Sequence, residues 1–273
     1  MVGWIFWDPN AIDRYTTLGV PGGLGYLATR AAPIAAAGDD AVVATMYAWA
    51  DDPVRTSMSV ARRETTFGAL WSARDRAIRD GLAVHAPAAP TDLAEVRDDL
   101  WTAVTACEPN GRPLFAACLN MPMPTDPVLS AWHALNCLRE WRGDTHNAVL
   151  IAAGLSPVEA LILDSAWSDY PADWMARSRM WAETAISTAM ERLQERGFAE
   201  DGRVLEAGID FRVEIEARTD ELTIDPWVGL GWERSQRIER ILRPTAELLL
   251  ERVDETAGPR YLSAARLHER SRS

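Results

Sequence analysis

Apolar residues recur at the spacing of an amphipathic helix through most of the chain, and caps, glycines and prolines divide the pattern into segments. Asp39 and Asp40 precede a helix that we expect to stop at Asp51–Pro53, and Gly81 is expected to end a later one. The stretch from His85 to Pro90 has the composition of a stiff linker. The pattern therefore predicts the first helices over residues 41–49, 65–80 and 91–107.

The same pattern continues into the second half of the chain. A helix over residues 127–142 is expected to break at Gly143, after which Asp144 would cap the next helix. Ser-Pro-Val-Glu at residues 156–159 has the spacing of a capping box and predicts another helix start. The last long helix is expected to restart at Pro244.

Between about residues 165 and 225 the order of the expected elements changes. Asp201-Gly202, between two short extended pieces, is a strong signal for a β-hairpin. Helix, helix, hairpin, helix is the layout of a winged-helix domain. We therefore predict a mainly α fold with a winged-helix-type unit in the C-terminal half, in which a short β-hairpin forms the wing. Its helices are expected over residues 172–180, 182–196 and 209–222.

A proline-rich stretch near residue 125 separates the two halves of the helical pattern. A chain of 273 residues is long enough for one or two domains. We expect an N-terminal helical domain over residues 1–125 and a C-terminal helical domain over residues 126–273. The second domain would contain the winged-helix-type unit.

Composition adds several exclusions. The chain is 48% hydrophobic and 25% charged, which is typical of a soluble globular protein. It contains no lysine, so Schiff-base chemistry, pyridoxal phosphate aldimines and the P-loop lysine are excluded. Three cysteines without a C-x-x-C pair predict neither a disulfide framework nor a structural zinc site.

The first residues predict the cellular compartment. Met1 to Asp8 contain no basic region and only a short apolar run, unlike a signal peptide. No apolar stretch approaches the roughly 20 residues that a helix needs to cross a bilayer. We expect a cytoplasmic protein that does not interact with membranes.

Candidate chemistry gathers on the predicted helix over 127–142 and just beyond it. His133, Asn136, Cys137 and Glu140 share one side of that helix, and Asp144 and His146 follow its expected end. This cluster predicts acid–base groups that face a substrate. The catalytic candidates are His133, Glu140, Asp144 and His146, and the substrate-binding candidates are Arg142, Asn136, Trp132 and Trp141.

Structural roles explain the same residues one by one. The stripe from His133 to Glu140 would be a solvated helix face, Asp144 a helix cap, and Arg142 a charge favoured at a helix C-terminus. The histidines and carboxylates are legal metal ligands, but their spacing differs from that of H-E-x-x-H. Neither a metal nor another cofactor is therefore expected.

Charge argues against a DNA-reading role for the winged-helix-type unit. The whole chain carries a net charge of −12, and Asp164 to Asp225 alone hold fifteen acidic residues and seven arginines, a net charge of −8. Winged helices that bind DNA need cationic residues, because phosphate contacts supply much of the affinity. We expect this unit to act as a scaffold or a dimer surface, which leaves a homodimer open.

The residues from His133 to His146 and the run Ala-Gly-Leu-Ser-Pro-Val-Glu-Ala at 153–160 resemble the SalK-type helix-turn-helix family of high-GC bacteria. Tyr26–Pro33, Gly111–Leu114 and Glu216–Asp220 are similar to the same family, so the resemblance covers most of the chain. Its members often sit in natural-product gene clusters. The family name describes a fold and implies no reaction.

Together these observations predict a protein that handles a small molecule of bacterial specialised metabolism. We favour a cofactor-independent enzyme with acid–base chemistry. A ligand-binding protein that uses the same residues is the other form of this prediction. The alternative is a ligand-responsive winged-helix transcription regulator, although nucleic acid is not the expected partner.

Overall fold

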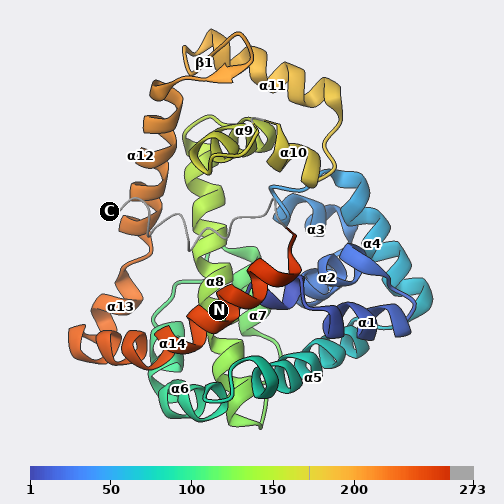
Figure 1. Ribbon diagram of the computed structural model, residues 1–273, viewed down its shortest axis with the longest axis vertical. Coiled ribbons are helices and arrows are strands. Elements are labelled where there is room, and N and C mark those ends of the chain that lie inside the picture. Colours follow the sequence, from blue (N-terminus) through green and yellow to red (C-terminus); the bar gives the residue numbers. More distant parts are fainter. Residues whose placement is uncertain (172, 259–273) are drawn as a thin grey trace.

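One long helix, α8 (Pro127–Ala152), runs through the middle of the molecule and carries most of the candidate residues (Figure 1). The structure is a computed structural model that describes residues 1–171 and 173–258. Asp126 caps α8 by accepting hydrogen bonds from the backbone N–H groups of Val128 and Leu129, and Pro127 occupies its first turn. Helices from both halves of the chain pack around α8.

The N-terminal part consists of short helices that pack on one another and on the first half of α8. They are η1 (Trp4–Phe6), α1 (Pro9–Thr17), α2 (Gly22–Ala31), η2 (Ala32–Ala37), α3 (Asp39–Thr45), α4 (Asp51–Glu64), α5 (Phe67–His85), α6 (Ala89–Thr105) and α7 (Pro113–Leu119).

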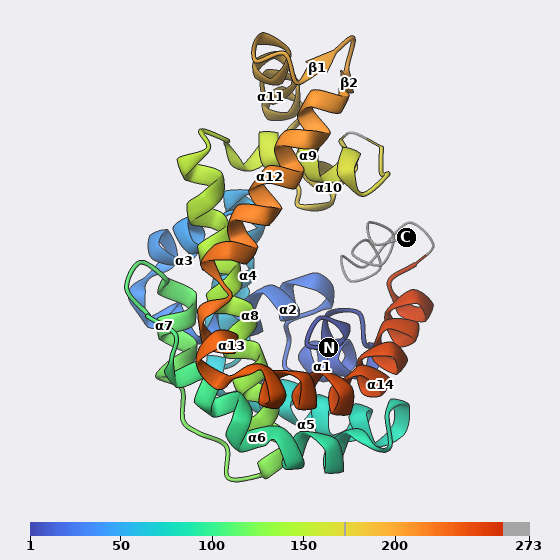
Figure 2. The ribbon, with the colours of Figure 1, turned by 90° about the vertical axis from the view of Figure 1, so that its left-hand side faces the viewer.

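The C-terminal part confirms the predicted order of elements and the mainly α fold. It contains α9 (Pro157–Trp167), α10 (Trp174–Ser178), α11 (Glu183–Glu195), β1 (Ala199–Glu200), β2 (Arg203–Val204), α12 (Glu206–Leu222), α13 (Asp225–Leu230) and α14 (Trp232–Thr256). The hairpin is antiparallel, and Asp201 and Gly202 form its turn with φ angles of 46° and 75°. Figure 2 shows α11 and the hairpin at the end of the molecule far from α5 and α6.

Several predicted helix ends are wrong, because tertiary contacts override the local signals. Gly81 does not end its helix, and α5 continues to His85. A Cβ atom at Gly81 would lie 2.3 Å from the ring of Trp4, so this glycine is needed for close packing. The expected linker over residues 85–90 is shortened to residues 86–88, since α5 ends at His85 and α6 begins at Ala89.

Other signals have the opposite meaning from the one expected. Asp51 and Asp52 begin α4 instead of ending a helix. Acidic side chains are stabilising in the first turn of a helix, because they interact favourably with the positive end of the helix dipole. Gly143 does not break α8, and Pro244 lies inside the single helix α14.

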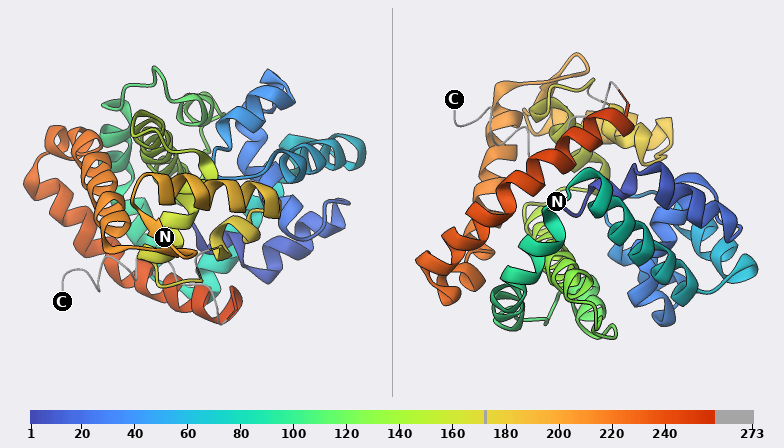
Figure 3. Two further views of the ribbon diagram at one scale, coloured as in Figure 1. Left: turned by 90° about the horizontal axis from the view of Figure 1, so that it is seen from above. Right: turned by 60° about the horizontal axis from the view of Figure 1, so that its bottom comes forward.

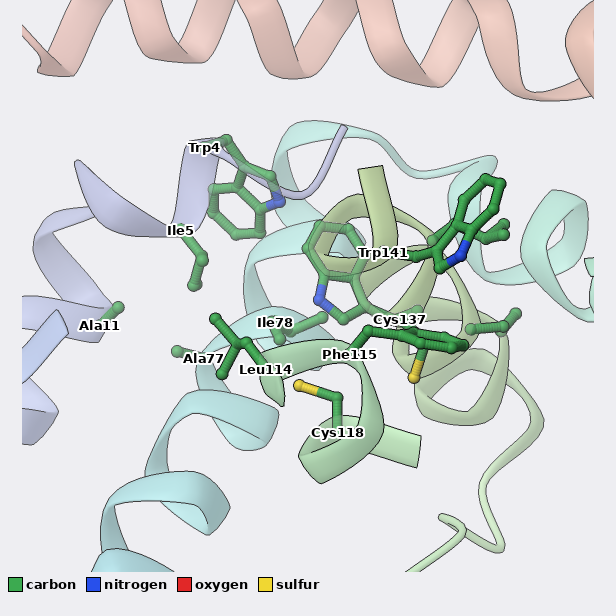
Figure 4. Close-up of a cluster of buried hydrophobic side chains, with 14 of the residues drawn as sticks. Trp4, Ile5, Ala11, Ala77, Ile78, Leu114, Phe115, Cys118, Cys137 and Trp141 are labelled. Carbon is green, nitrogen blue, oxygen red and sulfur yellow. The ribbon is translucent and has the colours of Figure 1, made fainter. Parts of the chain in front are cut away.

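The core has two hydrophobic clusters that share α8. The first joins the N-terminal helices, the first half of α8 and the buried face of α14, which lies across the N-terminal helices (Figure 3). Figure 4 shows part of this cluster, in which Trp4, Phe115 and Trp141 pack beside the buried Cys118 and Cys137. The second cluster joins the last turns of α8 with α9, α11, β1 and α12. The boundary near residue 125 between two helical domains stays a prediction.

In the described part of the chain, no single helix is both long and apolar enough to cross a membrane. Helices α8 and α9 reach that length and hydropathy only when they are counted together, across a bend of 107°.

Candidate functional site

The unbroken course of α8 separates the candidate residues that a break at Gly143 would have brought together. His133 and His146 are thirteen positions apart on one helix. That spacing places them about 20 Å apart along the axis and roughly 140° apart around it. They cannot act on the same atom of a substrate, and the structure does not bring the four predicted catalytic side chains into one cluster.

His133 is a core residue. Its ring lies 5.9 Å from the ring of Trp71 and 5.8 Å from that of Trp101, and Nε2 is 3.9 Å from Sγ of Cys137. Burial, assisted by the nearby guanidinium of Arg74, lowers the pKa of His133 to about 4. The imidazole is therefore neutral and packed, and the idea that this stripe is a solvated face is wrong.

Glu140 is buried and binds two arginines. It accepts hydrogen bonds from Nε and Nη2 of Arg30 at 3.1 and 2.7 Å, and from Nη1 of Arg139 at 2.7 Å. Burial favours the protonated carboxyl, but the two guanidiniums outweigh it and hold the pKa of Glu140 below its ordinary value. Glu140 is thus a permanent anion that fixes Arg30 and Arg139.

Asp144 caps a helix, but not the one predicted. Its Oδ2 accepts hydrogen bonds from the backbone N–H groups of Leu114 and Phe115, both at 2.9 Å, at the start of α7. Burial raises the pKa of Asp144 to about 6 against the opposing effect of these hydrogen bonds. The residue therefore joins α7 to α8 instead of starting a new helix.

The remaining substrate-binding candidates also lie apart from one another. Trp132 packs edge-on against Trp4 at 6.2 Å in the core, and Asn136 donates to Sγ of Cys118 at 3.7 Å. Trp141 is buried beneath the guanidinium of Arg112, which lies 5.3 Å from the ring centre. Trp132 and Asn136 line a small cavity of about 20 Å³, and Trp141 lines another of about 530 Å³; His133 is in the described lining of neither.

His146 and Arg142 instead line a cavity of about 420 Å³ between α8, α9, α10 and α12, which we call the interface cavity. Nδ1 of His146 lies 2.9 Å from Oγ1 of Thr219 on α12. Burial, and then the positive charges of Arg212 and Arg142, lower the pKa of His146 to about 4. The imidazole is neutral at pH 7 and offers hydrogen bonds without charge.

Ion pairs hold one wall of the interface cavity in place. Arg212 donates to Asp164 at 3.1 Å and to Glu216 at 2.7 Å, and its guanidinium lies over the ring of Trp167 at 4.5 Å. Arg142 also pairs with Glu216, and with Asp220 at 2.8 Å. Burial raises the pKa of Glu216, but Arg212 and then Arg142 outweigh it and lower it to about 2.

The apolar side chains that line the interface cavity include Leu150, Ala160 and Leu161 of the second hydrophobic cluster. The loop between α3 and α4 reaches across to the winged-helix-type unit, and three hydrogen bonds fix it there. Tyr47 Oη donates to the carbonyl of Leu155 at 2.8 Å, Trp181 Nε1 to that of Ala48 at 3.1 Å, and the N–H of Ala50 to that of Arg179 at 3.2 Å. A ligand in this cavity would contact both parts of the protein.

Sequence reasoning missed the arginines of this region. Arg139, Arg179 and Arg212 line the interface cavity, and none of them was a candidate. One of them could have been found from the sequence, because the helical pattern places Arg139 near the apolar side of α8. A charged residue at such a position has to be paired or has to face a cavity.

The surface that a winged helix presents to DNA is acidic here. The exposed face of α11 carries Glu191 and Glu195. Arg177 pairs with Asp173 and Glu183, and Arg196 donates to the carbonyls of Ala153 and Gly154, whereas Arg192 on α11 and Arg203 on β2 are exposed. Few cationic groups remain on this face for a phosphate backbone.

A search for metal-binding groups restricted to the described residues finds no set of three or more His, Cys, Asp or Glu side chains that could hold an ion. No curated protein and no solved structure matches the chain. A family model described as a helix-turn-helix family matches residues 1–255, nearly the whole chain. The helix order from α9 to α12 agrees with that description. The protein therefore belongs to this helix-turn-helix family.

Proposed function

We propose that the protein binds a small organic anion in the interface cavity. The observation that carries this proposal is the charge of the cavity wall. Four arginines line it together with two carboxylates, in a chain whose net charge is −12, while Glu140 and Asp220 pair with Arg139 and Arg142 from outside the lining. Guanidinium groups suit carboxylate and phosphate oxygens, because they offer paired N–H donors in a plane.

Size and position support the same proposal. A cavity of about 420 Å³ falls within the range of roughly 300–1,000 Å³ that is common for small-molecule sites. Trp167, Tyr170 and Met175 supply apolar and aromatic surface beside the charged groups. The resemblance to SalK-type proteins makes a compound of specialised metabolism the ligand that we favour.

Binding is better supported than catalysis. Glu140 and Asp144 are fixed by Arg30 and by the start of α7, and His133 lies in the core. Of the four predicted catalytic side chains, His146 is the one in the interface cavity. In the interface cavity, an enzymatic role would therefore fall to His146 as an acid–base group next to the bound anion, whereas Asp144 lines a separate cavity of about 600 Å³.

Isothermal titration calorimetry at pH 7 with acetate, succinate, citrate and benzoate tests the proposed binding. We expect at least one acid to bind, and we expect Arg179→Gln to weaken that binding at least tenfold. The matched control is Arg203→Gln, which removes an exposed guanidinium from β2, outside the cavity. No binding by any of the four acids, or equal weakening by both variants, would refute the proposal.

A ligand-responsive transcription regulator is the second candidate. Membership in a helix-turn-helix family and the winged-helix order of α9 to α12 favour it, whereas the acidic face of α11 opposes it. A gel-shift assay at moderate salt, with the DNA upstream of the protein's own gene, tests whether the protein is a DNA-binding regulator. A sequence-specific shift that a bound acid changes would establish the regulator, and no shift down to low salt would exclude it.

A further inference from the structure

A second cavity, of about 210 Å³, adjoins the interface cavity, and we call it the aromatic cavity. Arg139 and Arg179 line both, so the two cavities meet at these guanidiniums. The aromatic cavity lies between η1, α2, α10 and the loop between α3 and α4. Its aromatic side chains are Phe6, Trp7, Tyr26, Trp49 and Trp174.

These aromatic side chains form cavity walls at the edge of the core, where Trp7 and Trp49 pack against the first hydrophobic cluster. All five are partly exposed, in contrast to Trp4 and Trp132 of the core. The ring of Phe6 lies 4.1 Å from that of Tyr26. Trp174 stacks on Tyr170 at 4.3 Å, and Tyr170 lines the interface cavity. One stacked pair therefore borders both cavities.

Arginines are the charged side chains in the described lining of the aromatic cavity. Arg30, Arg139 and Arg179 line it, and its described lining contains no carboxylate. The buried Glu140 beside it compensates only one of the two guanidiniums that it binds. Arg30 donates through Nε and Nη2, and Arg139 through Nη1 and Nη2. Because each guanidinium has five N–H donors, both retain donors for a further anion.

Size limits the compound that fits. A cavity of about 150 Å³ with apolar walls takes up one benzene molecule. At about 210 Å³, the aromatic cavity accommodates one ring with a small substituent, but not a large ring system. Any larger part of a ligand would have to extend past Arg139 and Arg179 into the interface cavity.

We propose that the aromatic cavity binds the ring of a single-ring aromatic carboxylate, with the carboxylate held by Arg139 and Arg179 where the two cavities meet. This inference rests on the proposed function and names the ligand class. Phe6, Trp49 and Trp174 pack on the ring. Any larger substituent of the ligand extends into the interface cavity.

Calorimetry with three probes tests the ligand class. Benzoate carries the ring and the charge, benzamide has nearly the same shape without the charge, and acetate has the charge without the ring. We expect benzoate to bind at least tenfold more tightly than either of the other two. Equal affinity for benzoate and acetate would overturn the role of the aromatic walls, and equal affinity for benzoate and benzamide would overturn the role of the arginines.

Fluorine NMR of 4-fluorobenzoate locates the ring. We expect its resonance to shift on binding through the ring currents of the aromatic walls, and Trp49→Leu to abolish the shift and weaken binding at least tenfold. The matched control is Trp232→Leu, since Trp232 is 74% exposed and lies outside both cavities. If circular dichroism shows that Trp49→Leu has lost its helical structure, Phe6→Leu is measured in its place.

The outcomes separate this inference from the proposed function. If acids bind and Arg179→Gln weakens them, but Trp49→Leu changes neither the affinity nor the fluorine shift, the ligand class is wrong and the interface cavity remains the site. If no acid binds at all, both proposals fail.

Discussion

His133 shows how burial changes the chemistry of a residue that looked catalytic in the sequence. Between Trp71 and Trp101 its pKa falls from 6.5 to about 4, because burial penalises the imidazolium. The unfolded chain therefore binds a proton at this residue below about pH 6.5, whereas the folded protein does so only below about pH 4. Acidification through this window favours unfolding.

We predict that His133→Leu removes this part of the pH dependence. The free energy of unfolding of the natural protein should lose about 2 kcal/mol more than that of the variant between pH 7 and pH 5. Asp144 acts in the opposite direction, since its folded pKa of about 6 exceeds its ordinary value of 3.8. The comparison of the two proteins by urea unfolding cancels that contribution, and parallel pH profiles would contradict the prediction.

Glu140 is the second residue whose role depends on its surroundings. We predict that Glu140→Gln lowers the free energy of unfolding by about 3–5 kcal/mol, because Arg30 and Arg139 are left partly buried without a counter-charge. The matched control is Glu247→Gln on the exposed side of α14, which should stay within about 0.5 kcal/mol. Urea unfolding at pH 7 measures both, and equal effects would contradict this role.

At the scale of elements, local signals predicted the winged-helix-type unit well. The capping box of Ser156 and Glu159 forms as expected, and Asp201-Gly202 makes the hairpin turn. These structures depend on neighbours within a few residues, so the sequence pattern contains them. Gly81 was misread because packing against Trp4 requires a glycine there, whereas Gly143 and Pro244 show that one glycine or proline does not end a helix of 26 or 25 residues.

Gly81 gives a direct test of that explanation. We predict that Gly81→Ala destabilises the protein by about 1–3 kcal/mol, because the added methyl group meets the ring of Trp4 in a packed core. In the same helix, Gly68 has nothing within 4 Å of an added Cβ. Gly68→Ala should be neutral or stabilising by up to about 1 kcal/mol. Thermal unfolding measures the stability of both variants. If Gly81→Ala were as stable as the natural protein, contact with Trp4 would not be the reason that glycine occupies this position.

Asp144 connects two elements, which makes its contribution measurable. We predict that Asp144→Ala lowers the free energy of unfolding by about 1–2 kcal/mol through the loss of the cap on α7. Hydrogen exchange should localise the effect to the amides of Leu114 and Phe115. If instead the amides after Gly143 lost protection, Asp144 would cap the separate helix that the sequence predicted to begin there.

At the scale of the whole molecule, the site arises from contacts that no local pattern contains. Arg30, Glu140 and Arg139 come from α2 and α8 across more than a hundred residues of sequence separation. The interface cavity needs α12 and the loop between α3 and α4 as well. The sequence pattern predicted a helix over residues 127–142 with Arg142 at its end and His146 beyond it, but not the arginines that surround them.

The absence of lysine gains meaning at this scale. Arginine supplies every cationic side chain, and several of these side chains line two adjoining cavities, whereas the exposed face of α11 carries acids. The distribution of charge thus favours a small anion over a nucleic acid as the partner. The homodimer stays a prediction, which sedimentation equilibrium would test.

The most direct test of the central claim is a crystal structure of the protein with 4-bromobenzoate. We expect an anomalous bromine peak within the aromatic cavity and the carboxylate between Arg139 and Arg179. A bound molecule anywhere else on the protein, with both cavities holding only water, would contradict it.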